Sequence, residues 1–325
     1  MCTAISWLWN DHYFGRNLDL EYGYNETITI TPRNTPFSFR MAGQSDSHYA
    51  MIGMSTVIDG YPLYYEATNE KGLSMAGLNF PGNAVYLPPL DDHINVTPFE
   101  FIPWLLGQCS CIKDAKSLLS NVNLINVSFS PECPLSPLHW LIADRNQSIV
   151  VEPMADGLKI FDNPVGVLTN NPPFDFHLHN LGLYLNVTPD QAVSRFSANY
   201  PMKPWSSGMG GLGLPGDFSS ASRFVKASFV KLNSVSNGSE EENVSQFFHI
   251  LSSVVMPRGS VIVPGGKPDI TRYSCCCNTD RGIYYYRTYD NSRIYGVNLH
   301  QEDLNGQKPI SYPLITKEPI SIQNS

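Results

Sequence analysis

The chain has 325 residues, of which 42% are hydrophobic and only 15% are charged, so it is long enough for one large folded domain or two small ones. The net charge of −8, without a dense run of lysine and arginine, argues against nucleic acid as the main partner. The first thirty residues hold no apolar signal core and no stretch approaches membrane-spanning length, so we expect a soluble, cytoplasmic protein without a membrane partner.

The chain begins Met1-Cys2-Thr3, and Cys2 is its most informative residue. The initiator methionine is normally removed before a small residue, and its removal would place a free α-amine beside the Cys2 thiol. An α-amine titrates at about 7.7–8.0 and a thiol near about 8.5, so one can take a proton from the other. A nucleophile paired with its own N-terminal amine is an established catalytic arrangement. The alternative is that Cys2 lies in a frayed terminus.

The β-strands are predicted in three sets along the chain. Residues 26–31 alternate polar and apolar side chains, as a half-buried strand does. The same set continues with strands expected at 49–57, 63–67 and 73–78. The second set is expected at 136–143, 148–152, 158–161 and 165–169, and the third at 271–277, 282–288 and 293–298. Before them, a hairpin could make Cys2, Arg16 and Asp19 neighbours, because about a dozen residues suffice for two short strands and a turn.

Helices are predicted between these sets. Thr97-Pro98-Phe99-Glu100 has the pattern of a capping box, which predicts a helical region to about residue 121, broken near 109–111. A second helix is expected over about 220–232, and Ser239 is expected to cap a third. No linker divides the chain and no repeat is visible. Antiparallel strands with inserted helix pairs predict one α+β domain whose sheets are covered by helices.

Polar residues near strand ends are the candidates for chemistry. Asp19 could orient a terminal amine, and Arg16 would favour a thiolate, although the two could also form an ordinary surface salt bridge. Asn79 and Asn170 each follow a predicted strand. Asparagine there is usually part of a turn, but it is also a common donor to an oxyanion.

The cysteine, histidine and glycine motifs do not predict a metal or nucleotide site. The cysteines at 109 and 111 and at 275–277 lack the C-x-x-C spacing of a zinc site, so they are interpreted as buried small residues in a reducing compartment. His177 and His179 could share one face of a strand and are interpreted as surface or pocket-rim residues. Residues 208–213 match G-x-G-x-x-G, but no strand precedes them, so they are interpreted as a tight loop.

Six segments, spread over nearly the whole chain, carry a resemblance to a known family: residues 1–3, 13–19, 69–79, 167–172, 210–224 and 286–292. Together they closely resemble the choloylglycine hydrolase family of N-terminal nucleophile hydrolases, which contains the conjugated bile salt hydrolases and the penicillin V acylases.

The resemblance implies a four-layer αββα fold, in a single domain of residues 1–325 from which Met1 is removed. It implies that Cys2 is the nucleophile, that its freed amine is the base, and that Arg16 and Asp19 position and polarise it. Asn79 and Asn170 would supply the oxyanion site, Arg223 would support the catalytic centre, and the family pattern does not require Asn171. It further implies no cofactor and no metal, a homotetramer, and a gut-associated bacterial source.

The expected activity is hydrolysis of the amide bond of glycine- or taurine-conjugated bile acids. Asn79 resembles the bile salt hydrolase branch, as does the absence of a propeptide before Cys2, whereas residues 257–261 resemble the acylase branch. The alternatives are a penicillin V or N-acyl-homoserine lactone acylase, or a bile-acid- or lipid-binding protein that kept the fold without turnover. Phe80, Tyr61 and Phe129 are candidates for the apolar pocket that a steroid needs.

Overall fold

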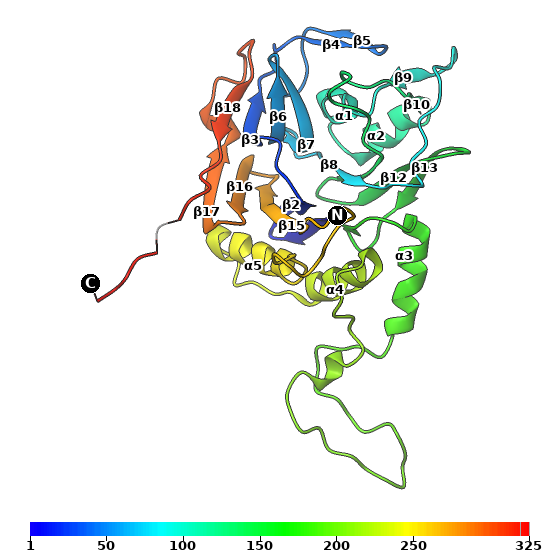
Figure 1. Cartoon of the computed structure of the whole chain (residues 1–325), viewed down its shortest axis with the longest axis vertical. Coiled ribbons are helices and arrows are strands. Elements are labelled where there is room, and N and C mark those ends of the chain that lie inside the picture. The colour runs from blue at the N-terminus through cyan, green and yellow to red at the C-terminus, as the bar shows by residue number, and fades with distance from the viewer. Residues whose placement is uncertain (319, 325) are drawn as a thin grey trace.

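The structure, a computed structural model, describes residues 1–318 and 320–324 and is built around two antiparallel β-sheets (Figure 1). The six-stranded sheet has the order β14 (Val167–Leu168), β1 (Cys2–Trp9), β2 (Asp11–Leu20), β15 (Ile270–Asn278), β16 (Ile283–Thr288) and β17 (Asn291–Asn298). The eight-stranded sheet has the order β13 (Gly157–Asp162), β12 (Ser148–Met154), β11 (Leu138–Ala143), β8 (Ser74–Asn79), β7 (Tyr61–Asn69), β6 (Met51–Ile58), β3 (Thr27–Thr31) and β18 (Ile310–Pro313).

Helices cover the outer face of each sheet, which gives the four-layer αββα arrangement that the resemblance implies (Figure 1). The six-stranded sheet is covered by α4 (Ser220–Asn233) and α5 (Glu240–Ser252), and the eight-stranded sheet by α1 (Phe101–Gln108) and α2 (Ile112–Leu119). A further helix, α3 (Phe174–Asn180), packs beside α4. The smaller elements are β4 (Phe37–Phe39), β5 (Gly43–Ser45), β9 (Ile94–Val96), β10 (Val122–Leu124) and the 3₁₀ turns η1 (Leu181–Tyr184), η2 (Met209–Gly211) and η3 (Leu299–Gln301).

Strand alternation divides the buried side chains between two hydrophobic cores. On β11, Leu141 and Ala143 belong to the core that also holds the inner face of the six-stranded sheet. Trp140 and Ile142, between them in sequence, belong to the core beneath α1 and α2. Since successive side chains of a strand point to opposite faces, one strand serves both cores. The eight-stranded sheet is therefore buried on both faces.

The N-terminal hairpin places the first residues of the chain inside the molecule. Asn10 makes the turn between β1 and β2 with a φ of 60°, a conformation that asparagine tolerates better than most residues. The register pairs Cys2 with Leu18 and Ala4 with Arg16. The predicted proximity of Cys2, Arg16 and Asp19 through a hairpin is thus confirmed.

The strands predicted from the sequence are confirmed to within two residues at each end, and so are the helix from residue 220 and the Ser239 capping box. The helical region predicted to about residue 121, with a break near 109–111, is confirmed by α1 and α2, but the capping box predicted at Thr97 is wrong. The first helix begins only at Phe101, with Glu100 as an N-cap that makes no side-chain capping bond. The Glu100 carboxylate instead accepts hydrogen bonds from the Thr97 hydroxyl at 2.7 Å and from the Arg40 backbone N–H at 2.8 Å. These contacts take the carboxylate away from the helix end.

The interpretation of the two histidines is also corrected. His177 and His179 lie on α3 rather than on a strand, and His177 is fully buried. The two-residue spacing of these histidines matches the period of a strand, but the segment folds as a helix, so the strand prediction is wrong. The short strands β4, β5, β9, β10 and β18 were not predicted either.

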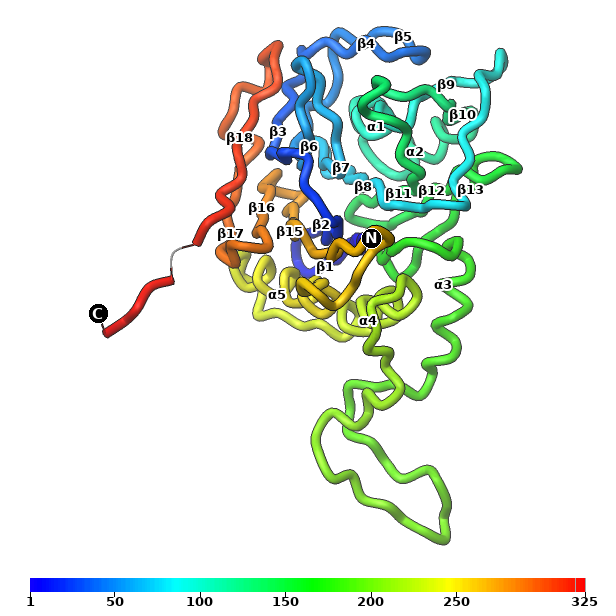
Figure 2. The backbone as a smooth tube through the Cα atoms, in the orientation of Figure 1, coloured from blue at the N-terminus to red at the C-terminus, as the bar shows by residue number. Residues whose placement is uncertain are grey.

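A long excursion separates η1 from α4 and projects away from the two sheets (Figures 1 and 2). It contains the glycine-rich run at 208–213, which forms η2 and a tight turn, as the sequence predicts. Among the residues that the structure describes, no helix combines the length and the apolar character that crossing a membrane requires.

Gly15 marks a close approach of two backbones in the six-stranded sheet. A Cβ atom at this position would lie 1.9 Å from the Cys275 carbonyl oxygen on β15. We expect Gly15→Ala to lower the free energy of unfolding by about 1–3 kcal/mol or more, because backbone atoms must move to admit the methyl group. The measurement is urea-induced unfolding of both proteins.

Gly182→Ala is the matched control for this variant. A Cβ atom there meets nothing within 4 Å, so its unfolding should match the original chain. Equal stability of the two variants would contradict the close approach of β2 and β15.

Candidate active site

Five elements bring the six predicted site residues to the N-terminal end of β1. Cys2 begins β1, Arg16 and Asp19 lie on β2, Asn79 ends β8, Asn170 follows β14, and Arg223 lies on α4. Figure 2 shows the N-terminus in the middle of the body, whereas the C-terminal end extends away from it. The sequence separations are large, so only the tertiary fold could join these groups.

Cys2 is an ordered strand residue and not part of a frayed terminus, because it pairs with Leu18 and is only 3% exposed. Its side chain lies on the face of the six-stranded sheet that meets the other sheet. This follows from the register, since Cys2 and Arg16 share a face and Arg16 bonds to carbonyls of β7 and β8. The thiol therefore lies between the two sheets.

Asn170 connects Cys2 to the second sheet. Its side-chain oxygen accepts a hydrogen bond from the Cys2 backbone nitrogen at 2.9 Å, and its Nδ2 donates to the Asn79 carbonyl oxygen at 2.7 Å. Buried His177 holds the backbone of Asn170 through a 2.8 Å contact from Nε2 to the carbonyl oxygen. The Asn79 side-chain amide makes no hydrogen bond within the described residues and keeps its donors available.

Arg223 fastens the beginning of β1 from the helical side. Its Nη1 donates to the Cys2 carbonyl oxygen and, at 2.6 Å, to the Thr3 hydroxyl, while its Nη2 donates to Asn170 Oδ1 at 2.7 Å. The side chain is 1% exposed. Burial lowers the pKa of Arg223, an effect opposed first by the charge of Asp19. A planar guanidinium suits this task, since it offers several donors in fixed directions.

Arg16 reaches across the interface between the sheets. Its Nη1 donates to the Gly77 carbonyl oxygen at 2.6 Å and lies 3.6 Å from Glu66 Oε2. Burial alone lowers the pKa of Arg16, but electrostatic interaction with the groups around it, Cys2 first and then Tyr273 and Glu66, raises the pKa overall.

Asp19 lies on the opposite face of β2 from Arg16, and the two do not pair. Both are buried, so the alternative of a surface salt bridge is wrong. Asp19 Oδ1 accepts from the Thr271 hydroxyl at 2.6 Å, and its carbonyl oxygen accepts from the Met1 amine at 2.7 Å. Burial raises the pKa of Asp19, while Arg223 and the N-terminal amine act in the opposite direction.

Three acidic or hydroxyl residues at the site were missed by the sequence analysis. Asp269 Oδ2 lies 3.3 Å from the Met1 amine, and Thr271 bonds Asp19. Glu66 pairs with Arg16 and accepts hydrogen bonds from the hydroxyls of Tyr273 and Tyr284. The sequence signal for Glu66 is a single carboxylate inside an otherwise uncharged strand. Asp269 and Thr271 have no such signal, because they reach the site only through tertiary contacts.

The aromatic residues suggested for an apolar pocket fall into two places. Phe80 is fully buried, with its ring 4.2 Å from that of His139, so it packs in the protein interior. Tyr61 and Phe129 are half-buried, and their rings lie 5.9 Å apart. In the part of the chain that the structure describes, no group of three or more histidine, cysteine, aspartate or glutamate side chains is placed to hold a metal ion.

The model of the family described as "Linear amide C-N hydrolases, choloylglycine hydrolase family" matches residues 2–312. The "Bile salt hydrolase/transferase" of Lactiplantibacillus plantarum is 54% identical over 314 residues, which cover 97% of each chain.

Two solved structures are similar to this one. A crystal structure of a variant of the conjugated bile acid hydrolase of Clostridium perfringens has a TM-score of 0.92 at 36% identity and covers all of both chains. The penicillin V acylase of Agrobacterium tumefaciens has a TM-score of 0.76 at 18% identity, covering 96% of this chain and 91% of the other. The second likeness concerns the fold alone. Both agree with the predicted α+β fold of the N-terminal nucleophile hydrolase type.

Glu66→Gln tests the buried charge pair between the sheets. We expect a loss of about 3–5 kcal/mol in the free energy of unfolding, because the variant keeps the shape but leaves Arg16 buried without its carboxylate. Chemical unfolding measures the effect. Asp156→Asn, at an exposed pair with Lys159, is the matched control and should change little. Equal stability of the two variants would mean that Glu66 carries no charge in the folded chain.

Proposed function

Because this chain belongs to the choloylglycine hydrolase family of linear amide C–N hydrolases, we propose that it cleaves glycine or taurine from conjugated bile acids, with Cys2 as the nucleophile. The observation that carries the proposal is the 2.9 Å hydrogen bond between the Cys2 nitrogen and Asn170 Oδ1. This hydrogen bond holds the Cys2 nitrogen in place, and that nitrogen becomes the α-amine once Met1 is removed. The proposal includes this removal, a single domain, and the expected cytoplasmic location in a gut bacterium.

In the proposed reaction the α-amine of Cys2 takes the proton of the thiol, and the thiolate attacks the amide carbonyl carbon. Arg16 lies on the same face of the sheet and stabilises the thiolate by its charge. The carbonyl π electrons move to oxygen, which becomes the oxyanion of a tetrahedral intermediate. Arg223, which bonds the Cys2 carbonyl oxygen, holds the nucleophile in place during these steps.

Asn79 and Asn170 are the proposed donors to the oxyanion. The Asn79 amide has no partner among the described residues, and Asn170 Nδ2 has a second N–H beyond the one that bonds Asn79. One such donor contributes about 3 kcal/mol to the stability of a tetrahedral intermediate. The intermediate collapses as the α-ammonium protonates the leaving nitrogen of glycine or taurine. Water, deprotonated by the same amine, then releases the bile acid from the thioester.

Cys2→Ser should lower kcat/KM for glycocholate and taurocholate by at least about a thousandfold, because the hydroxyl is a far weaker nucleophile at neutral pH. The assay measures free glycine or taurine, with penicillin V as a third substrate. Turnover that survives in Cys2→Ser would contradict the mechanism. Faster cleavage of penicillin V than of either bile salt would favour the acylase alternative, which residues 257–261 suggest.

Mass spectrometry of the active protein belongs to the same experiment. A mass without Met1 is expected. Full activity in a chain that retains Met1 would remove the α-amine from the role of base. Tight bile salt binding without turnover would indicate instead a binding protein that kept the fold.

We also propose a homotetramer, in which the excursion between η1 and α4 contacts neighbouring subunits. Its support is the exposure of large apolar side chains: Leu185, Phe196 and Trp205 are 86%, 81% and 85% exposed. Apolar surface of this extent on one projecting segment is typical of an interface between proteins. The excursion lies outside the two sheets (Figure 1).

Trp205→Asp should shift the protein from a tetramer toward smaller species, since it places a charge where an apolar contact is proposed. Size-exclusion chromatography with light scattering measures the mass. Val235→Asp is the matched control, because Val235 is 72% exposed but lies outside the excursion. The proposal fails if the original chain is a monomer at micromolar concentration, or if Trp205→Asp keeps its full mass.

A further inference from the structure

A buried pair of ionisable side chains, His139 of β11 and Glu152 of β12, lies next to the proposed oxyanion site. Both side chains are fully buried, and His139 Nδ1 lies 3.0 Å from Glu152 Oε1. His139 is opposite Leu78 in the register of β11 with β8. Leu138, the residue before it, is opposite Asn79. The pair is therefore one strand position from a proposed oxyanion donor, although neither side chain has a part in the reaction described above.

The other ring nitrogen of His139 holds the segment that carries Asn170. His139 Nε2 lies 3.0 Å from the Thr169 carbonyl oxygen. The next carbonyl oxygen along the chain, that of Asn170, lies 2.8 Å from Nε2 of buried His177. Two buried imidazoles thus bond consecutive carbonyl groups. Because a carbonyl group lies in the plane of its peptide, these contacts constrain the backbone from which the Asn170 side chain projects.

The His139 ring also packs against the residue that follows Asn79. It stacks on the Phe80 ring, with the ring centroids 4.2 Å apart and an angle of 7° between the planes. Phe80 is fully buried, and its backbone N–H donates to the Pro137 carbonyl oxygen at 2.7 Å. One imidazole therefore contacts the residue before Asn170 and the residue after Asn79.

The acceptors around His139 determine where its hydrogens lie. The Thr169 carbonyl oxygen can only accept, so His139 Nε2 carries a hydrogen. The ring is then either an imidazolium beside a carboxylate, or a neutral imidazole whose Nδ1 accepts from a protonated Glu152. In both forms a hydrogen lies between Nδ1 and the carboxyl group. Glu152 thereby keeps the Nε2–H of His139 directed at Thr169.

Glu152 also connects the first imidazole to the second. Its Oε1 and Oε2 accept from the Phe174 backbone N–H at 3.1 and 3.3 Å, at the first residue of α3. The same helix carries His177. A buried ion pair adds little net stability over apolar side chains of similar volume, but it fixes directions that apolar side chains cannot. The contacts of this pair therefore suit positioning better than stabilisation.

We propose that His139 and Glu152 are positioning residues for the oxyanion site, which hold Asn79 and Asn170 where their amide N–H groups can meet the developing oxyanion. The proposal rests on the function proposed above, since it takes these asparagines as the oxyanion donors. The pair acts through the backbone and the ring of neighbouring residues and not on the reacting atoms. Donors to an oxyanion act in the transition state, so their misplacement lowers kcat and leaves KM unchanged.

His139→Asn tests the proposal, with glycocholate as the substrate. Asparagine Nδ2 can replace imidazole Nδ1 as the donor to Glu152, but the variant loses the bond to Thr169 and the stack on Phe80. We expect kcat to fall by about ten- to a hundredfold while KM stays within about threefold, since a small misplacement of a catalytic group has an effect of this size. Free glycine is measured over a range of substrate concentrations.

Alkylation of Cys2 by iodoacetamide separates positioning from damage to the fold. The thiolate displaces iodide from a saturated carbon, so a C–S bond forms, a C–I bond breaks and no oxyanion appears. His139→Asn should therefore be alkylated within about twofold of the rate of the original chain, as followed by mass spectrometry of the N-terminal peptide. If alkylation falls together with hydrolysis, the variant has lost the site as a whole, and the proposal is overturned.

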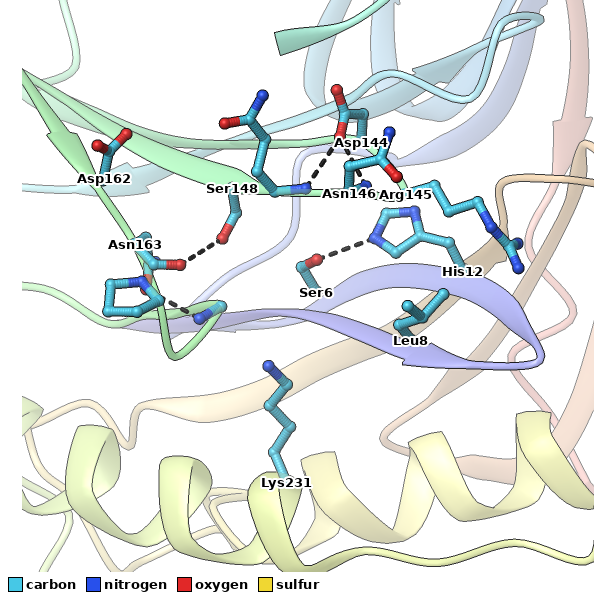
Figure 3. A pocket seen from close by; sticks show the side chains of 13 residues that line it. Ser6, Leu8, His12, Asp144, Arg145, Asn146, Ser148, Asp162, Asn163 and Lys231 are labelled. Atoms are coloured by element: carbon cyan, nitrogen blue, oxygen red, sulfur yellow. Dashed lines mark hydrogen bonds between the residues drawn. The ribbon is translucent and has the colours of Figure 1, made fainter.

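His12→Asn is the matched control. His12 is also buried, and its ring nitrogens lie 2.9 and 2.8 Å from the hydroxyls of Ser6 and Thr279. It lines a cavity of about 300 Å³ (Figure 3). It pairs with Leu8, six residues along β1 from Cys2. This variant should keep both the kcat and the alkylation rate of the original chain.

Glu152→Gln is the conservative variant. Its amide can donate to His139 Nδ1 and accept from the Phe174 N–H, so kcat should stay within about threefold of the original value. Glu152→Asp keeps the charge but shortens the side chain by one carbon, so it cannot keep both contacts, and kcat should fall by at least about fivefold. If His139→Asn fails to fold, these two variants decide the question, and an equal kcat in both overturns the proposal.

The proposal is also overturned if His139→Asn keeps its kcat. A failure of the proposed function gives a different result. If penicillin V is the faster substrate, only the substrate proposal fails, and the same ratios are expected with penicillin V. If turnover survives in Cys2→Ser, or the original chain cleaves none of the substrates, crystal structures of the variants decide. The Asn170 side chain should then be displaced in His139→Asn but not in His12→Asn, and an unmoved side chain overturns the proposal.

Discussion

The site depends on the buried guanidinium of Arg223. The first residues of a chain ordinarily fray, because few contacts repay the entropy of ordering them. Here one side chain from α4 bonds the Cys2 carbonyl oxygen, the Thr3 hydroxyl and Asn170 Oδ1 together. Asn170 in turn contacts both the Cys2 nitrogen and β8. A helix on the outer face thus holds the end of an inner strand in register with the second sheet.

A second buried guanidinium, that of Arg16, links the two sheets from the other face of the hairpin. Its hydrogen bond to Gly77 and its pairing with Glu66 compensate part of the cost of burial. Its charge also lies on the face of the sheet that holds the Cys2 thiol. The same residue therefore contributes to sheet packing and to the electrostatics of the proposed nucleophile.

The two ends of β1 differ in how completely their charges are matched. Near Cys2, the buried Arg223 makes hydrogen bonds through all three of its nitrogens. Near Ser6, the partly buried ammonium of Lys231 makes one hydrogen bond, to the Val165 carbonyl oxygen.

The sequence by itself determined the α+β class, the main strands, the helices from residues 220 and 239, and the family, because periodicity, capping and motifs are local properties. It also indicated six candidate site residues. Only the tertiary structure decided their partners, since Glu66, Asp269 and Thr271 reach the site through pairing across strands distant in sequence. The start predicted at Thr97 failed for the same reason, although the helical region itself is confirmed: a long-range contact with Arg40 engages the Glu100 carboxylate that the local pattern assigned to capping.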